Sequence, residues 1–291
     1  MARLHLIELE DQPWLPASVR AYATDCLRAL FSTLLHRSRV AERLRDVLEA
    51  TGERELLDLC SGSSGPLARL LDDLAEEGLD VNALLTDLHP HPELGQGLSP
   101  RLRYRAEPLD ARQVPAELAG VRTIFAGLHH FRPHDAVAIL ADCAAQGRGL
   151  AVFEPSSRRL LDALAVPFIG IVSIVAAPFL RPFHWRRLFW TWLVPLVPIV
   201  VVWDGWVSCA RSYTVTELRD LCEQALERAD ARGRYHFEVG RDPLSGLPAG
   251  VSWLLGRPLP ARDSTCEPDA RLEKTPDSKR VDRSNLMNPS T

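Results

Sequence analysis

A turn of small residues after a short apolar segment is the first feature of this sequence suited to chemistry. The segment ELLDLC (55–60) contains the carboxylate of Asp58, and the turn SGSSG (61–65) leads into Pro66. Proline suits the first turn of a helix, small side chains let the backbone approach a ligand closely, and a helix N-terminus favours a negative charge. The stretch therefore predicts a strand, a turn and a helix that bind a small ligand with an anionic group such as a carboxylate.

Two more carboxylates follow the next two apolar segments. Asp87 comes at the end of 81–86, and Asp110 comes shortly after 102–106. Open α/β sheets bind ligands outside the carboxyl ends of their strands, where Asp87 can accept hydrogen bonds from both hydroxyls of a ribose. Asp110 is placed to bind the exocyclic amine of an adenine. Each carboxylate taken singly could equally be a solvated loop residue or a turn cap, so it is their order that indicates a nucleoside ligand.

The elements that must position these groups alternate between strands and helices. Strands are expected over residues 55–60, 81–86, 102–106, 121–126 and 150–153, with a final pair over 235–239 and 251–255. Helices are expected over residues 17–51 (two amphipathic helices), 66–77, 134–146 and 216–231. Such alternation indicates a doubly wound, mostly parallel sheet that is covered on both faces.

In its pattern of residues, the chain resembles the class I S-adenosylmethionine-dependent methyltransferases. The resemblance rests on the spacing of Asp58, Gly62, Asp87 and Asp110, then LHHF (128–131), a strand that ends in Glu154, and the terminal hairpin. It covers about residues 20–257, apart from an apolar insertion. It implies a Rossmann-like α/β fold with a sheet of seven strands in the order 3-2-1-4-5-7-6, the seventh antiparallel, and S-adenosylmethionine as the cofactor.

The resemblance also implies roles for individual residues. Asp58 would hold the turn and the methionine amino group, Asp87 would bind the ribose, and Asp110 with the Ala111 backbone would hold the adenine. The cofactor-binding set implied in this way is Asp58, Cys60, Gly62, Ser63, Asp87, Leu88, Asp110 and Ala111. Cys60 and Ser64 stand where the family commonly has glycine, and both are small enough to leave cofactor binding plausible.

The acceptor side of the site is expected to contain His129 and His130, which follow the fourth strand. A neutral imidazole is well matched to accept a proton near pH 7, so one of the two is expected to be the catalytic base. The alternative is that one is buried against the backbone and the other exposed. Glu154, Arg211 and Tyr213 are candidate substrate residues, although Glu154 could cap the following segment and the other two could form a structural network.

The segment 160–203 interrupts the α/β pattern with two apolar runs joined by RPFHWRR (181–187). Because so large an apolar surface is rarely left in water, we expect a shallow hairpin at a membrane interface. Its tryptophans would lie at headgroup depth, and Arg181, Arg186 and Arg187 would reach phosphates. A substrate lid or a dimer surface is the alternative. The position of the hairpin after the fifth strand predicts a small acceptor that is hydrophobic or lipid-like.

Composition limits the partners. The net charge of −4 provides no basic surface of the kind that captures nucleic acid. The six cysteines include no CxxC pair and no histidine at zinc-ligand spacing, so neither a metal site nor a disulfide framework is expected. The start of the chain lacks the apolar run of a secretory signal. A cytoplasmic location is predicted, peripheral to or embedded in the inner leaflet through residues 160–203, and the oligomeric state stays open.

Five regions are predicted: an N-terminal helical region (1–53), a cofactor-binding core (54–159), the apolar insertion (160–203), a C-terminal helix and hairpin (204–260), and a disordered tail (261–291). Two other functions stay open. The first is a non-catalytic membrane-associated protein that retains the fold. The second is a nicotinamide-dependent oxidoreductase, which is disfavoured because the turn lacks GxGxxG and the only lysines, Lys274 and Lys279, lie in the tail.

Overall fold

The computed structural model describes residues 3–36, 38–62, 65–90, 98–181, 183–246 and 249–260. The chain divides into two units, residues 1–259 and 260–291, and every helix and strand named below belongs to the first. The predicted tail lies outside the described residues, as do Ser63 and Ser64 of the predicted cofactor turn.

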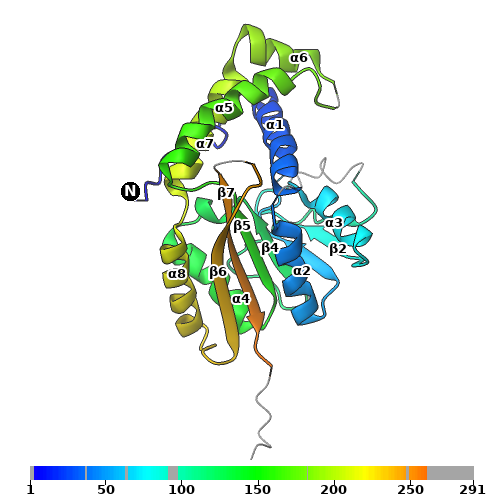
Figure 1. Cartoon of the computed structure of the whole chain (residues 1–291), viewed down its shortest axis with the longest axis vertical. Helices are drawn as coiled ribbons and strands as arrows, with labels where there is room; N and C mark the ends of the chain where they lie inside the picture. Colours follow the sequence, from blue (N-terminus) through cyan, green and yellow to red (C-terminus); the bar gives the residue numbers. More distant parts are fainter. Residues whose placement is uncertain are drawn as a thin grey trace, which may run out of the picture. The chain divides into compact units, whose positions relative to one another are not determined.

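A seven-stranded sheet forms the centre of the first unit (Figure 1). Its strands are β1 (Glu55–Asp58), β2 (Asn82–Leu85), β3 (Leu102–Tyr104), β4 (Val121–Phe125), β5 (Leu150–Glu154), β6 (Tyr235–Pro243) and β7 (Gly250–Pro258). They lie in the order β3-β2-β1-β4-β5-β7-β6. Strand β7 is antiparallel to both of its neighbours, and the pairs among β1 to β5 are parallel. The predicted Rossmann-like, doubly wound fold is therefore confirmed.

Helices cover both faces of the sheet. The helices outside the insertion are α1 (Ala17–His36), α2 (Val40–Thr51), α3 (Leu67–Glu76), α4 (Pro133–Ala145) and α8 (Val215–Arg228). Successive residues of a strand point to opposite faces. Leu56 accordingly packs with α2 and α3 in one core cluster, and Leu57 packs with α4 and α8 in another. Burial on both faces is why β5 is apolar from Leu150 to Phe153.

The terminal hairpin is longer than the sequence predicted. Strands β6 and β7 pair over nine residues each, whereas only 235–239 and 251–255 were expected. Pairing continues through Gly240 because the ring of Trp253 covers that position, where a Cβ would lie 2.2 Å from the indole. Glycine, aspartate and proline at 240–243 suggest a turn when local sequence is considered alone. Packing against the Trp253 ring is the tertiary contact that overrides this local preference.

The predicted apolar insertion is helical and follows β5. It contains α5 (Leu160–Ala176), α6 (Trp185–Leu188), a π-helical turn η3 (Phe189–Leu193) and α7 (Leu196–Arg211), which runs across the predicted boundary at 203 and 204. Helices α5 and α7 cross closely at Gly170 and Gly205, where a Cβ would come within 2.5 and 2.9 Å of a valine on the other helix. Helix α1 packs along α7, so the three helices form a layer beyond one end of the sheet (Figure 1).

Among the described residues, no single helix has both the length and the apolarity that a membrane crossing needs. Residues Trp185–Leu193 and Leu196–Arg211 meet them only when taken together, and they are bent by 71° relative to one another.

Candidate cofactor and acceptor site

The turn after β1 has the backbone shape that glycine favours. The φ angle is 58° at Cys60, 48° at Gly62 and 48° at Gly65, all in the left-handed region. A side chain with a Cβ adopts this region at a cost in free energy. Cys60 therefore occupies a position suited to glycine, which agrees with the glycine pattern that the resemblance implies.

Asp58 holds this turn from inside the protein. Its carboxylate is buried and accepts a hydrogen bond from Oγ1 of Thr123 on β4 at 2.6 Å. Its carbonyl oxygen accepts from Oγ of Ser61 at 2.9 Å, and Ser61 Oγ accepts in turn from the backbone N–H of Thr86 at 3.0 Å. Burial raises the pKa of Asp58 to about 7, against these hydrogen bonds. Asp58 thus ties the turn to the strands on both sides of β1.

Hydrogen bonds bring the loops after β1, β2 and β3 together. The backbone N–H of Gly62 donates to Oδ2 of Asp87 at 3.0 Å, and the N–H of Leu109 donates to the carbonyl oxygen of Asp87 at 2.9 Å. Burial raises the pKa of the Cys60 thiol, and the three predicted carboxylates lie near enough to raise it further. Leu88, next along the β2 loop, is half exposed. The three loops therefore meet at the carboxyl edge of the sheet.

The two remaining predicted carboxylates also have partners within the protein. Oδ1 of Asp87 accepts from the backbone N–H of His89 at 2.9 Å. Asp110 forms an ion pair with Arg112 at 2.7 Å, and this contact lowers the pKa of Asp110. Ala111 beside it is buried. A ligand that reaches these carboxylates must therefore share or replace the contacts seen here.

A cavity of about 290 Å³ adjoins the turn. Ser61 and Gly65 line it on the side of the turn, and mostly apolar residues of α1, α5 and α7 line the other side. The predicted catalytic residues His129 and His130 also lie in its wall, on the 3-10 turn η2 (Leu128–His130). The cavity therefore places an apolar space between the cofactor turn and the two imidazoles.

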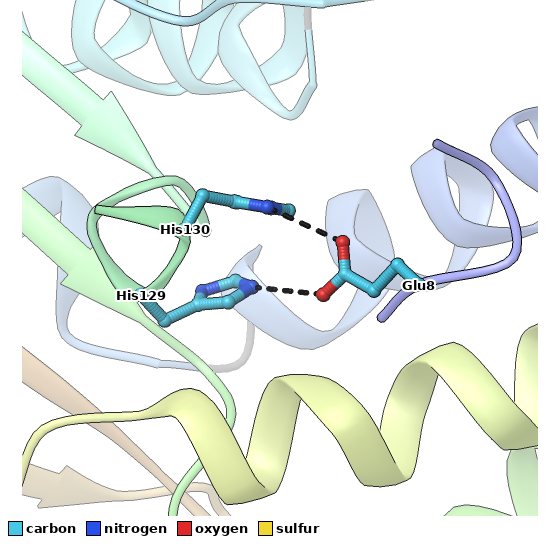
Figure 2. Close-up of side chains that lie close together, drawn as sticks. All are labelled: Glu8, His129 and His130. Atoms are coloured by element: carbon cyan, nitrogen blue, oxygen red, sulfur yellow. Dashed lines mark ion pairs between the residues drawn. The ribbon is translucent and has the colours of Figure 1, made fainter. Parts of the chain in front are cut away.

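The two histidines meet the carboxylate of Glu8, as Figure 2 shows. Nδ1 of His130 lies 3.2 Å from one carboxylate oxygen of Glu8, and Nε2 of His129 lies 4.0 Å from the other. Nδ1 of His129 is 2.8 Å from Oε2 of Glu154, whose Oε1 accepts from the backbone N–H of Leu128 at 2.6 Å. Nε2 of His129 is buried and has no hydrogen-bond partner in the described part of the chain. Glu154 thus fixes the ring, and Nε2 faces Glu8 without a hydrogen bond to it.

Burial and charge set the protonation of this cluster. Burial opposes protonation of His129, but the carboxylates of Glu154 and Glu8 outweigh it and raise the pKa of His129. The pKa of His130 is lowered well below its usual value by desolvation and by the charges of His129 and Arg211, although 43% of its side chain is exposed. Burial raises the pKa of Glu8 to about 7, against the attraction of His129 and Arg211. Groups perturbed in these ways are suited to moving a proton near neutral pH.

Glu8, His129 and His130 also have the spacing of metal ligands, since one ligand atom from each lies within 4.8 Å of the others. However, Nη1 of Arg211 lies 3.1 Å from Oε1 of Glu8 and 3.4 Å from Nδ1 of His130. A guanidinium therefore already supplies positive charge to two of the three groups. We interpret the cluster as an ion-pair network.

Glu8 and Glu10 were not assigned from the sequence. They belong to the segment 3–10, which is held against α7 because the Asp204 carboxylate accepts from the backbone N–H groups of Leu9 (2.6 Å) and Glu10 (3.0 Å). Both glutamates line the cavity. Burial, followed by the charge of Asp204, raises the pKa of Glu10 to about 7. The signal that could have found them is their spacing, since alternate residues of an extended chain share one side.

Arg211 and Tyr213, the other predicted substrate residues, bind other parts of the chain and are not among the residues that line the cavity. Nε of Arg211 donates to the carbonyl oxygen of Leu6 at 2.8 Å. The Tyr213 hydroxyl donates to the carbonyl oxygen of Phe131 at 2.7 Å, and the Arg3 guanidinium lies 4.2 Å from the centre of the Tyr213 ring. In this structure they join the N-terminal segment and the loop after η2 to α7.

The strand order, with an antiparallel seventh strand, is that of a Rossmann-like sheet, and a left-handed turn follows its first strand. For the sequence itself, no family model and no curated protein matches. Similarity is found among solved structures, at low identity.

One similar structure is the O-methyltransferase NcsB1 from neocarzinostatin biosynthesis, solved with S-adenosylmethionine and 2-hydroxy-5-methyl naphthoic acid. It has a TM-score of 0.45 and 20% identity, over 84% of this chain and 59% of that one. The mitomycin 7-O-methyltransferase MmcR has a TM-score of 0.42 and 18% identity, over 82% and 55%. The plantazolicin methyltransferase BpumL, in complex with SAH, has a TM-score of 0.44 and 9% identity, over 82% and 97%. The chain thus spans little more than half of the two O-methyltransferases, and likenesses this distant say nothing about its own reaction.

Proposed function

We propose that this chain is an S-adenosylmethionine-dependent methyltransferase. The observation that carries the proposal is the junction of three loops, in which Gly62 and Leu109 both donate to Asp87; of the same turn, Ser61 reaches the cavity, which these three residues do not line. A left-handed turn of small residues next to a carboxylate fits an aminoacyl group and a ribose. In the proposal, the cofactor is held by the turn at 58–63, by Asp87 with Leu88, and by Asp110 with Ala111.

The bound cofactor supplies an electrophilic methyl group, and the residues of the chain align the acceptor and exclude water. In our proposal Nε2 of His129 accepts the proton that the acceptor loses. Its position in the cavity wall and its lack of a partner among the described residues support this role. Glu154 acts as a positioning residue, since a carboxylate on Nδ1 selects the tautomer with a lone pair on Nε2. His130 and Glu8 complete the polar end of the cavity.

The acceptor in this proposal is small and hydrophobic or lipid-like. Polar groups that include Glu8, Glu10 and His129 line the cavity together with residues of α1, α5 and α7, most of which are apolar, although Arg28, Asp162 and Asp204 among them are charged. Such a cavity favours an amphipathic molecule whose reacting hydroxyl or amine lies among the polar groups. The apolar walls would bury the remainder of the molecule.

The outer surface of the insertion supports a membrane interface as the source of the acceptor. Its exposed large apolar side chains are Leu160, Leu161, Leu164, Phe168, Ile171, Val172, Val175, Ile174, Phe179, Phe183, Trp185, Phe189, Trp192, Leu193, Ile199, Trp203 and Trp206. The indole N–H groups of Trp192, Trp203 and Trp206 donate to backbone carbonyls of Ile174, Ile7 and Ala163. With these polar atoms already paired, the indole rings can contact hydrocarbon at little cost.

The basic residues of the insertion divide into two groups. Arg181 and Arg186 are exposed beside this apolar surface, where they can reach lipid phosphates. The expectation for Arg187 was wrong, because its guanidinium is fully buried and pairs with Asp25 at 2.8 Å. An interior partner on α1 could not be inferred from the local sequence RPFHWRR.

The proposed activity is tested with methyl-labelled S-adenosylmethionine and a lipid extract from cells that lack the gene. We expect the label to enter one lipid of this extract. In cells that lack the gene, that lipid should be lighter by one methyl group than in cells that have it. Binding of the cofactor without any transfer, to that extract or to the aqueous metabolites, would favour the non-catalytic alternative. Binding of NADH with no affinity for S-adenosylmethionine would favour an oxidoreductase.

A further inference from the structure

A second cavity of about 200 Å³ lies between α1 and α5. Helix α1 lines it with Cys26, Leu27 and Leu30, and α5 lines it with Ile169 and Val172. Because α1 and α5 are held apart here while each packs on α7, the cavity is part of the helical layer beyond the sheet (Figure 1). No residue of the cofactor turn lines it.

The polar side chains in the wall of this second cavity are satisfied internally. Oγ1 of Thr33 donates to the carbonyl oxygen of Ala29 at 2.9 Å, and Oγ of Ser173 donates to that of Gly170 at 2.7 Å. Burial raises the pKa of the Cys26 thiol to about 11, so the thiol is neutral. The lining residues, all of them described, include no charged side chain. Such a wall offers nothing to a polar ligand and suits a hydrocarbon chain.

The second cavity adjoins the acceptor cavity across shared apolar side chains, and one residue of its wall is also exposed on the apolar surface. Leu27, Ile169 and Val201 line both cavities. Val172, which lines the second cavity, is also 48% exposed on the outer surface of the insertion. Only apolar side chains therefore stand between the second cavity and the cavity that His129 lines, and a chain that occupied both would pass Leu27, Ile169 and Val201.

We infer that the space between α1 and α5 binds the hydrocarbon tail of the methyl acceptor, with the reacting group placed at Glu8 and His129. The acceptor is thus an amphipathic lipid with a single extended chain. This inference rests on the proposed methyltransferase function for the identity of the occupant. The shared apolar boundary of the two cavities and the uncharged wall of the second carry it.

The test uses dansyl probes attached to alkyl chains of roughly four to twelve carbons. The affinity of the wild-type protein for the probe should rise by roughly fourfold for each methylene buried, until the second cavity is full. Ala29→Phe and Ala176→Phe each place a ring in the second cavity. These variants should bind the long probes no more tightly than the short ones. Val175→Phe, on the exposed side of the same helix α5, is the matched control and should keep the full dependence on chain length.

An equal dependence on chain length in the filled variants, or none in the wild-type protein, would overturn the inference. Thermal melting monitors the folding of each variant. A measurement that needs no variant is a crystal of the wild-type protein with a probe brominated at the end of its chain. Bromine density between α1 and α5 is expected, and bromine bound elsewhere contradicts the inference. Calorimetry with S-adenosylmethionine tests the proposed function separately. Because the probe experiment contains no cofactor, a failure to bind S-adenosylmethionine would contradict the proposed function without changing the meaning of the probe results.

Discussion

Oε2 of Glu154 lies 2.8 Å from Nδ1 of His129, while Nε2 of the same ring has no hydrogen-bond partner among the residues that the structure describes. The other oxygen of Glu154 accepts from the backbone N–H groups of Leu128 and His129. One carboxylate therefore fixes both the ring and the turn that carries it. This leaves Nε2, which lies 4.0 Å from a carboxylate oxygen of Glu8, as the buried ring nitrogen without a hydrogen bond.

Removal of that nitrogen should abolish most of the transfer without weakening cofactor binding. His129→Ala should lower the rate of label transfer to the lipid extract by about 10²–10⁴-fold, which is the usual contribution of a general base. His134→Ala is the control, because His134 is exposed just beyond the same turn. Transfer by the His129 variant at the wild-type rate would exclude His129 as the base.

The pH dependence of transfer should report on Glu154. Because a neutral His129 is required and its carboxylate partners raise its pKa above 6.5, the rate should fall as the pH decreases through that raised pKa. Glu154→Gln removes one of these partners and should move the acidic limb of the profile to lower pH. A profile that is the same in the variant and the wild-type protein contradicts the positioning role.

Glu10 should make the protein less stable at alkaline pH. Its pKa is raised from 4.5 to about 7 in the folded state, so its contribution to stability is full below pH 4.5 and is lost as the pH rises through about 7. Glu10→Gln should therefore increase the free energy of unfolding at pH 8 by up to about 3 kcal/mol, and change it little at pH 4.5. Denaturant titration at both pH values measures this, with the exposed Glu49→Gln as the control. A stabilisation that is equal at both pH values would show that ionisation of Glu10 is not the cause.

The apolar surface of the insertion should bind lipid vesicles. Phe168 and Leu193 are 67% and 73% exposed on it, and Phe168→Asp or Leu193→Asp should weaken binding to vesicles with anionic lipid by roughly tenfold or more. Flotation of the full chain with vesicles measures this. Leu259→Asp, at the end of the sheet hairpin, should bind as the wild-type protein does. Failure of the wild-type protein to float with any vesicle would remove the membrane interface from the proposal.

The sequence was sufficient to predict the sheet and the meeting of the three cofactor loops. Parallel strands end at one edge of a sheet, so the loops that follow them lie close together, and hydrogen bonds from Gly62 and Leu109 to Asp87 join these loops. The alternation of apolar segments indicated a doubly wound, mostly parallel sheet, whereas its strand order was implied by the resemblance.

The acceptor side was harder to predict because it is assembled from distant parts of the chain. Glu8 reaches the histidines only because its segment is fastened to Asp204, some 195 residues away, and no local pattern encodes that pairing. The roles of Arg211 and Arg187 were obscured for the same reason. Both guanidiniums have interior partners on the N-terminal part of the chain, namely Glu8 and Asp25.

The central claim is that S-adenosylmethionine binds where the Gly62 turn meets Asp87, and calorimetry tests it most directly. The wild-type protein should bind S-adenosylmethionine and S-adenosylhomocysteine but not NADH. Asp87→Ala should weaken both by about 100-fold, since it removes hydrogen bonds to a charged group. Asp80→Ala, at an exposed carboxylate before β2, should bind as the wild-type protein does. Tight binding of NADH, or equal affinity of the Asp87 variant for S-adenosylmethionine, would contradict the account.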